Sequence, residues 1–140
     1  MDDATRERSR PPIRSYEDLE VYQRAMQLMR RVHRIARDLP DYEKFDLAQQ
    51  IRRASKSVPA NIAEGYAKKR SAADFRRYLA MAMGSANEMV VHFKIGQELE
   101  YFTPQMAGTV TAEYEILGKQ LNRLIQAWRT IESVTPTSNL

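Results

Sequence analysis

The stretch Gln50–Gly65, QIRRASKSVPANIAEG, decides how the first half of this chain folds. Its apolar residues Ile51, Val58 and Ile62 recur at helical spacing, and that spacing continues in phase across Pro59. An interior proline removes one backbone hydrogen bond and costs about 3 kcal/mol, which bends or breaks a helix. Because the apolar phase is unbroken, the sequence predicts one helix that is kinked at Pro59 rather than two separate helices.

This helix is predicted to run from near Asp41 to near Tyr66, with Gly65 placed where a C-terminal cap would lie. Its predicted buried stripe comprises Phe45, Ala48, Ile51, Ser55, Val58 and Ile62. Asn61 and Glu64 lie three residues apart, so the two side chains are expected to support each other on one face and fix the helix register. A catalytic role for this pair would need a partner that the sequence does not show.

A first amphipathic helix is predicted upstream. Ser15 followed by Asp18 is typical of a helix start, and Pro40 ends the pattern. Its predicted apolar face comprises Leu19, Tyr22, Ala25, Met26, Met29, Val32, Ile35 and Ala36. The opposite face holds Arg30, Arg34 and Arg37, with Arg24 and Arg31 on its flank.

Two further helices are predicted downstream, one starting at Ser71 with Asp74 and one at Thr103 with Pro104. Their stripes comprise Phe75, Tyr78, Leu79, Ala82, Ala86, Met89, Phe93 and Gly96 in the third helix, and Met106, Val110, Tyr114, Leu117, Leu121, Leu124, Trp128 and Ile131 in the fourth. Four amphipathic helices joined by short turns bury their stripes most simply as an up-down-up-down antiparallel bundle. The predicted fold is therefore all-α.

Length and composition predict one domain. The 140 residues allow a single core, predicted over residues 15–133, with a disordered basic arm at 1–14 and a flexible tail at 134–140. The chain has no cysteine, so disulfides and thiolate metal sites are excluded, and its first residues lack an apolar run. We expect a cytoplasmic protein that does not enter a membrane.

The net charge of +4 is unevenly distributed. Residues 1–70 hold 16 Lys and Arg against 11 Asp and Glu, whereas residues 71–140 hold 6 against 7. A polyanion should therefore prefer the first half, although solvated helix faces would give the same count. The candidate nucleic-acid contacts are Arg52, Arg53, Lys56, Lys68, Lys69, Arg70, Arg76 and Arg77.

The sequence contains no complete catalytic or metal-binding pattern. A di-iron bundle needs a repeated Glu-x-x-His, and none occurs; Glu88 and His92, four residues apart, are a weak single pair. No nucleophile elbow, phosphate-binding loop or dinucleotide fingerprint is present. We therefore predict a protein that is not an enzyme and that holds no metal or cofactor.

The segment from Gln50 to Met89, together with DLEVYQRAMQL at residues 18–28, resembles the bacterial family of four-helix proteins encoded in intervening sequences of 23S ribosomal RNA genes. The resemblance covers about residues 16–130, with NIAEG, a basic turn and Gly84-Ser85 as its specific parts. It departs from the family at Asp46, Asn87 and Glu100, where the family favours glycine, an apolar residue and glycine.

The resemblance implies a four-helix protomer in a ring-like homo-oligomer, with a pentamer favoured. It extends to accessory proteins of diversity-generating retroelements, which bind nucleic acid and a reverse transcriptase. Arg52, Arg53, Asn61, Glu64 and Gly65 match family positions, and the resemblance assigns no catalysis to them.

Two functions remain open from sequence. The first is a basic oligomer that binds nucleic acid, structured RNA above all, through the phosphate backbone. The second is a protein-interaction scaffold or accessory factor, for example for a reverse transcriptase. An enzyme with an unrecognised site is a third and weaker alternative. Against the first stands the lack of an evident RNA-stacking platform, since the only aromatic candidates near the cations are Tyr66 and Tyr78.

Overall fold

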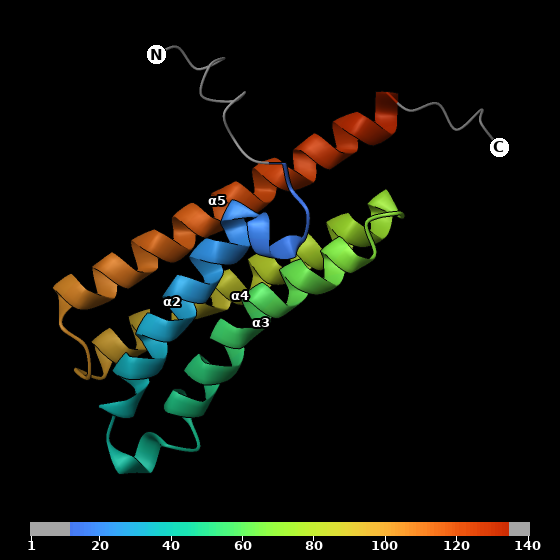
Figure 1. Ribbon diagram of the computed structural model, residues 1–140. Helices are drawn as coiled ribbons and strands as arrows, with labels where there is room; N and C mark the ends of the chain where they lie inside the picture. Colours follow the sequence, from blue (N-terminus) through green and yellow to red (C-terminus); the bar gives the residue numbers. More distant parts are fainter. Residues whose placement is uncertain (1–11, 135–140) are drawn as a thin grey trace.

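The computed structural model of the protein describes residues 12–134, in which four long helices run in alternating directions (Figure 1). They are α2 (Glu20–Arg37), α3 (Leu47–Ala67), α4 (Ala72–Glu98) and α5 (Pro104–Val134). Two short 3₁₀ turns, Tyr16–Asp18 and Asp41–Glu43, precede α2 and α3. No strand occurs within the described range, which confirms the all-α prediction. The predicted arm at 1–14 and tail at 134–140 fall almost entirely outside it.

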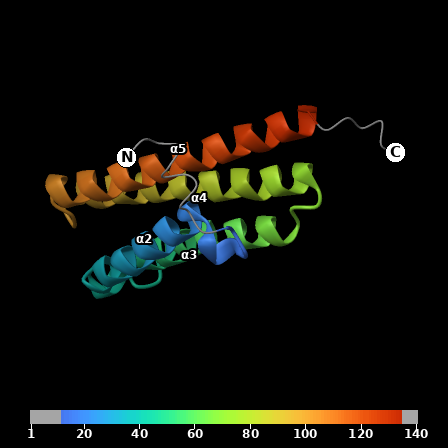
Figure 2. The same cartoon turned by 45° about the horizontal axis from the view of Figure 1, so that its top comes forward.

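Helices that are consecutive in the chain pack against each other. α2 lies on α3, α3 on α4 and α4 on α5, while α5 makes a lighter contact back to α2. In Figure 2 α4 and α5 lie side by side, and α2 and α3 form a second hairpin below them. This order agrees with the predicted bundle; assembly of several copies into a ring stays a prediction.

The start of α3 differs from the sequence expectation. The helix begins at Leu47 rather than near Asp41, because the backbone of Asp46 adopts φ −124° and ψ −107°, which interrupts it. Phe45 therefore points outward with 78% of its surface exposed, and its predicted place in the core is wrong. Further along, α3 continues through Pro59, which is buried inside it, as the unbroken apolar phase predicts.

The core follows the predicted stripes most closely in α4, where Phe75, Leu79, Met89 and Phe93 are all buried. In α2 the inward face is rotated from the prediction. The side chains that α2 buries are Val21, Ala25, Leu28, Val32 and Ala36. Tyr22, Met26, Met29 and Ile35 are only half-buried, because a helix held mainly by one neighbour buries a narrow stripe.

Side-chain caps fix two of the helix starts as predicted. The Ser71 hydroxyl accepts from the Asp74 N–H at 3.1 Å and begins α4, and the Thr103 hydroxyl accepts from the Met106 N–H at 3.1 Å and begins α5. Ser15 caps only the 3₁₀ turn, and α2 begins at Glu20.

The connection between α4 and α5 is tightly built. The rings of Phe93 and Phe102 stack with centroids 4.7 Å apart, and a Cβ atom added at Gly96 would lie 2.2 Å from the Phe102 ring. Glu100 in this turn has φ 62°, a backbone conformation that favours glycine. The resembled family favours glycine at this position. In the described part of the chain, Glu100 is the one non-glycine residue with a left-handed backbone.

Candidate nucleic-acid interface

The positive charge of the protein gathers on the α2–α3 hairpin. Residues 21–37 and 47–63 contain eight Lys and Arg and no Asp or Glu, so the remaining residues together carry a net charge of −4. All eight cations are exposed or partly exposed, and six of them are here called the basic face: Arg30, Arg34, Arg37, Arg52, Arg53 and Lys56. Three of them, Arg52, Arg53 and Lys56, are contacts that the sequence predicted.

His33 of α2 lies close to cations of both α2 and α3. Burial lowers the pKa of its imidazole, against an opposing hydrogen bond to the Arg52 backbone. The positive charges of Lys56, Arg52 and Arg37 lower the pKa of His33 further. Because such effects fall off steeply with distance, all three cations lie near His33. Cations of the basic face from both helices are therefore found around one residue.

The basic face is little neutralised within the chain. Among the described residues of segments 21–37 and 47–63, one arginine forms an ion pair. Arg31 Nη1 lies 3.1 Å from Glu113 Oε2 of α5, and Arg31 is not part of the basic face. Arg52 donates from Nη2 to the carbonyl oxygen of Lys44 at 3.0 Å, a contact that leaves its charge in place. Arg37 and Lys56 are exposed, and no described carboxylate lies within ion-pair distance of either.

The second predicted group of cations surrounds the turn between α3 and α4, where local partners hold them. Lys68 Nζ lies 3.2 Å from Glu64 Oε1, donates to the Tyr78 hydroxyl at 2.9 Å and has a raised pKa because of these two bonds. Lys69 Nζ sits 3.8 Å above the centre of the Tyr66 ring. These cations are already used to cover aromatic rings.

The first turn of α4 is similar. Arg77 Nη2 lies 3.5 Å from Asp74 Oδ1, and its guanidinium is 4.9 Å from the centre of the Tyr78 ring. Arg70 is exposed in the turn, and Arg76 has a partner within the protein. The structure therefore separates the eight predicted contacts into a group on the basic face and a group at the turn.

The predicted Asn61–Glu64 interaction does not form. The Asn61 amide donates to the Ser57 carbonyl at 2.9 Å and to the Ser57 hydroxyl at 3.0 Å, whereas Glu64 turns to Lys68. The Ser57 hydroxyl also accepts from Ser85 of α4 at 2.9 Å. Asn61 is thus connected to α4 through two serines rather than to Glu64, and its role in fixing the register stays a prediction.

Gly65 is not a helix cap, because α3 continues to Ala67. A Cβ atom at Gly65 would lie 2.8 Å from Cβ of Tyr78 and 3.4 Å from the Phe75 ring and the Phe75 carbonyl. Glycine is needed here because the end of α3 passes close to the start of α4.

Beside the α3–α4 contact lies a shallow polar groove of about 320 Å³, lined in part by Gln50, Arg53 and Glu88. Glu88 Oε1 lies 3.8 Å from Nε2 of the buried His92, whose pKa is lowered by burial despite this carboxylate. In the part of the chain that the structure describes, no three His, Asp or Glu side chains are grouped as metal ligands would be.

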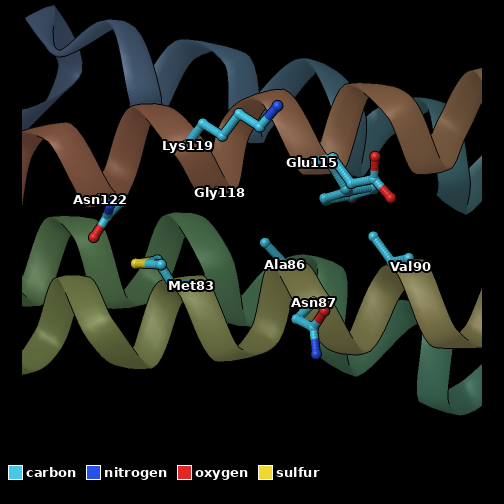
Figure 3. A pocket seen from close by; sticks show the side chains of 9 residues that line it. Met83, Ala86, Asn87, Val90, Glu115, Gly118, Lys119 and Asn122 are labelled. Atoms are coloured by element: carbon cyan, nitrogen blue, oxygen red, sulfur yellow. The ribbon is translucent and has the colours of Figure 1, made fainter.

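A more apolar groove of about 430 Å³ lies between α4 and α5 (Figure 3). Met83, Ala86 and Val90 of α4 line one side, and Glu115, Lys119 and Asn122 come from α5. The Tyr114 side chain also lines it, and its buried hydroxyl has no hydrogen-bond partner, so the pKa of Tyr114 is raised by burial. The groove carries no nucleophile paired with a base.

Sequence reasoning missed that the arginines of α2 join the α3 cations. The signal was present, since residues 21–37 contain five arginines and no acid, whereas the predicted contacts lie close to one another in sequence, at 52–56 and 68–77. It also missed the exposure of Phe45, because a helical spacing of Phe45 with Ala48 hides the interruption at Asp46. No described helix is long and apolar enough to cross a bilayer.

The chain is similar to a known protein family and to a solved structure. Residues 17–123 match the family described as 23S rRNA-intervening sequence protein, which confirms the resemblance seen in the sequence. A crystal structure of a protein of unknown function from the S23 ribosomal protein family, from Bacteroides thetaiotaomicron VPI-5482, is 26% identical and superposes with a TM-score of 0.69, covering 75% of this chain and 97% of that one. No curated protein matches the chain.

Proposed function

Because the chain belongs to the family of 23S rRNA-intervening sequence proteins, whose molecular role is poorly characterised, we propose a function from its charge distribution. The protein is a non-enzymatic binder of nucleic acid, RNA above all, that holds the phosphate backbone on its basic face. The observation that carries this proposal is the pair of packed helical segments, 21–37 and 47–63, with eight cations and no acid.

Phosphates suit this surface for a physical reason. Eight like charges on one hairpin repel each other, and a polyanion relieves that repulsion while its counterions are released to solvent. The arginines at positions 30, 34 and 37 follow one side of α2, so a backbone running along the hairpin meets several of them. Contacts of this kind read no base sequence.

Self-association belongs to the same proposal. A ring of about five copies would carry a total charge of about +20 and present several basic faces to one strand, which raises avidity without new contacts. The large apolar side chains that α4 and α5 leave exposed support an interface there. They are Met81, Val91, Ile95 and Ile116.

The test compares two triple variants with equal change in charge. Arg37→Gln, Arg53→Gln and Lys56→Gln remove three exposed cations of the basic face; Lys94→Gln, Lys119→Gln and Arg123→Gln remove three exposed cations of α4 and α5. Binding of fluorescent RNA is measured from low to moderate salt. With about four phosphates contacted, the affinity of the unaltered protein for single-stranded RNA should fall about 50-fold between 50 and 200 mM salt.

The basic-face triple should flatten the salt dependence by two to three phosphates, with each lost contact lowering the slope by about one. The control triple should keep the slope of the unaltered protein. Equal losses in both triples would mean that net charge alone attracts RNA, and no binding at low salt would refute the proposal.

A second candidate function is a protein-interaction scaffold, such as an accessory factor for a reverse transcriptase. The apolar groove between α4 and α5 favours it, because a neutral groove beside exposed apolar side chains suits a protein partner better than a phosphate. Capture of one defined partner by nuclease-treated protein, lost on substitution in this groove, would support the scaffold function.

A further inference from the structure

Two aromatic rings stand in solvent at the end of the α2–α3 hairpin. Tyr42 is 75% exposed and Phe45 is 78% exposed, the largest exposures among the big apolar side chains that the structure describes. Both belong to the connection between Arg37 and Leu47, where the sequence predicted a helix that would have buried Phe45. A contact that covers the ring of an exposed phenylalanine removes apolar surface from water and is therefore favourable.

The connection holds these rings outward through what it buries. Leu39, Glu43 and Leu47 turn inward, each less than a tenth exposed, and the Glu43 carboxylate accepts from the Leu47 N–H at 3.4 Å. Backbone hydrogen bonds from Glu43 to Pro40 at 2.8 Å and from Asp46 to Glu43 at 3.0 Å close the turn. The rings of Tyr42 and Phe45, here called the platform, are held on this fixed turn. They therefore lose little conformational entropy on binding.

The platform is joined directly to the basic face. The Arg52 guanidinium bonds the carbonyl of Lys44, the residue next to Phe45, at 3.0 Å. The Lys44 ammonium lies 5.4 Å from the centre of the Phe45 ring. A strand whose phosphate rests at Arg52 therefore has its neighbouring base within reach of Phe45.

We propose that Phe45, together with Tyr42 of the same turn, is a stacking site for an unpaired base of the nucleic acid held by the basic face. This inference rests on the proposed function and narrows its substrate to RNA or DNA with single-stranded segments. Aromatic side chains stack on bases with little sequence preference, because every base has a π face. Bases within a duplex are already stacked and cannot reach the ring.

Nearby carboxylates sharpen this division. Asp41 and Asp46, both exposed, flank the two rings and repel phosphates from the turn itself. The cations available to the strand's phosphates beside the rings are therefore Arg52 and Lys44, and an uncharged base is not repelled from Phe45. The other aromatic candidates, Tyr66 and Tyr78, are only partly exposed, and the cations lie closer to their rings, at 3.8 to 4.9 Å from the ring centres against 5.4 Å for Lys44 and Phe45.

The experiment uses Phe45→Ala, with Phe45→Trp as the variant that keeps a ring and Ile13→Ala as a matched loss of an exposed apolar side chain, which precedes α2 and lies outside the connection from Arg37 to Leu47. The probes are a single-stranded RNA containing 2-aminopurine and a duplex RNA of equal length, each titrated over a range of salt. Solution mass and melting temperature are recorded for every variant.

Phe45→Ala should weaken single-strand binding about tenfold, abolish the stacking-induced fluorescence change and leave both the salt slope and duplex binding unchanged. Phe45→Trp should restore the fluorescence change, and Ile13→Ala should behave as the unaltered protein.

Three results would overturn the inference. The first is single-strand affinity that Phe45→Ala leaves intact while the salt-dependent binding persists, which refutes stacking and spares the proposed function. The second is an equal loss for duplex and single strand. The third is a fall in solution mass on Phe45→Ala, which assigns the ring to contact with a second copy. Absence of salt-dependent binding in the unaltered protein would instead refute both proposals.

Discussion

The two hairpins of this protein divide its properties between them. Within α2 and α3 the segments 21–37 and 47–63 hold eight cations and no acid, whereas α4 and α5 together hold six cations and six acids. Tyr16 and Tyr22 pair at the start of the first hairpin, but the closest ring contacts in the described residues belong to the second. Phe75 of α4 lies against Trp128 of α5 with ring centroids 4.5 Å apart, and Phe93 stacks on Phe102.

This difference teaches how a small bundle tolerates a concentrated charge. Eight like charges on adjacent helices oppose folding, and aliphatic contacts between α2 and α3 must be supplemented from outside the hairpin. α4 packs extensively on both α3 and α5, so it joins the charged half to the neutral half. Stability should therefore depend mainly on α4 and α5, and binding on α2 and α3.

The largest expected effect tests the neutral half. Gly96→Ala places a methyl group 2.2 Å from the Phe102 ring, which must leave its stack with Phe93. We expect a loss of about 2–3 kcal/mol in the free energy of unfolding, measured by urea denaturation. RNA affinity per folded molecule should stay unchanged.

Gly118→Ala is the control and should not lower the free energy of unfolding. Apart from the local helix backbone, no atom lies within 4 Å of the added methyl, and alanine favours a helix by up to about 1 kcal/mol relative to glycine. If Gly96→Ala were as stable as the unaltered protein, the assignment of stability to α4 and α5 would be wrong.

A smaller effect compares the two histidines, one in each half. Burial lowers the pKa of both His33 and His92, so the unfolded chain binds protons more readily than the folded one. Stability is then full above pH of about 6.5 and falls as the pH drops from there toward the lowered folded values. His92→Leu should reduce this dependence, as followed by melting temperature from pH 8 to pH 5.

The same titration separates the two halves. His33 is affected by the cations Arg37, Arg52 and Lys56, whereas the charge acting on His92 is that of Glu88. Polyanion bound on the basic face should therefore raise the pKa of His33, read from its imidazole proton resonances, and leave His92 unmoved. Equal shifts for both would contradict a ligand localised on α2 and α3.

The smallest effect concerns the turn of the neutral half. Glu100 has φ 62°, so Glu100→Gly should relieve the backbone and stabilise the protein by about 0.5–1 kcal/mol. Glu100→Ala keeps the same backbone strain and should change stability little. Comparable gains from both variants would attribute the effect to loss of the carboxylate instead. Chemical denaturation with closely matched m-values distinguishes them.

The sequence predicted the helices and two of their caps because burial periodicity and N-terminal hydrogen bonds are local. It could not predict that Asn61 bonds Ser57 instead of Glu64, since spacing gives the face of a residue and not its partner. It placed Gly65 at a helix end, whereas the reason for glycine is the neighbouring Tyr78 of another helix. The sequence predicted the three cations of the basic face on α3 but not the three on α2, because α2 and α3 meet only in the folded chain.

The packing of each helix on its successor in the chain also bears on how quickly the protein folds. Most contacts join segments that are close in sequence, and the connections between α3 and α4 and between α4 and α5 are short. Such low contact order is typical of chains that fold in microseconds to milliseconds. Since α2 and α3 are synthesised first, their like charges remain without the packing of α4 until that helix emerges, and completion of the fold awaits the second hairpin.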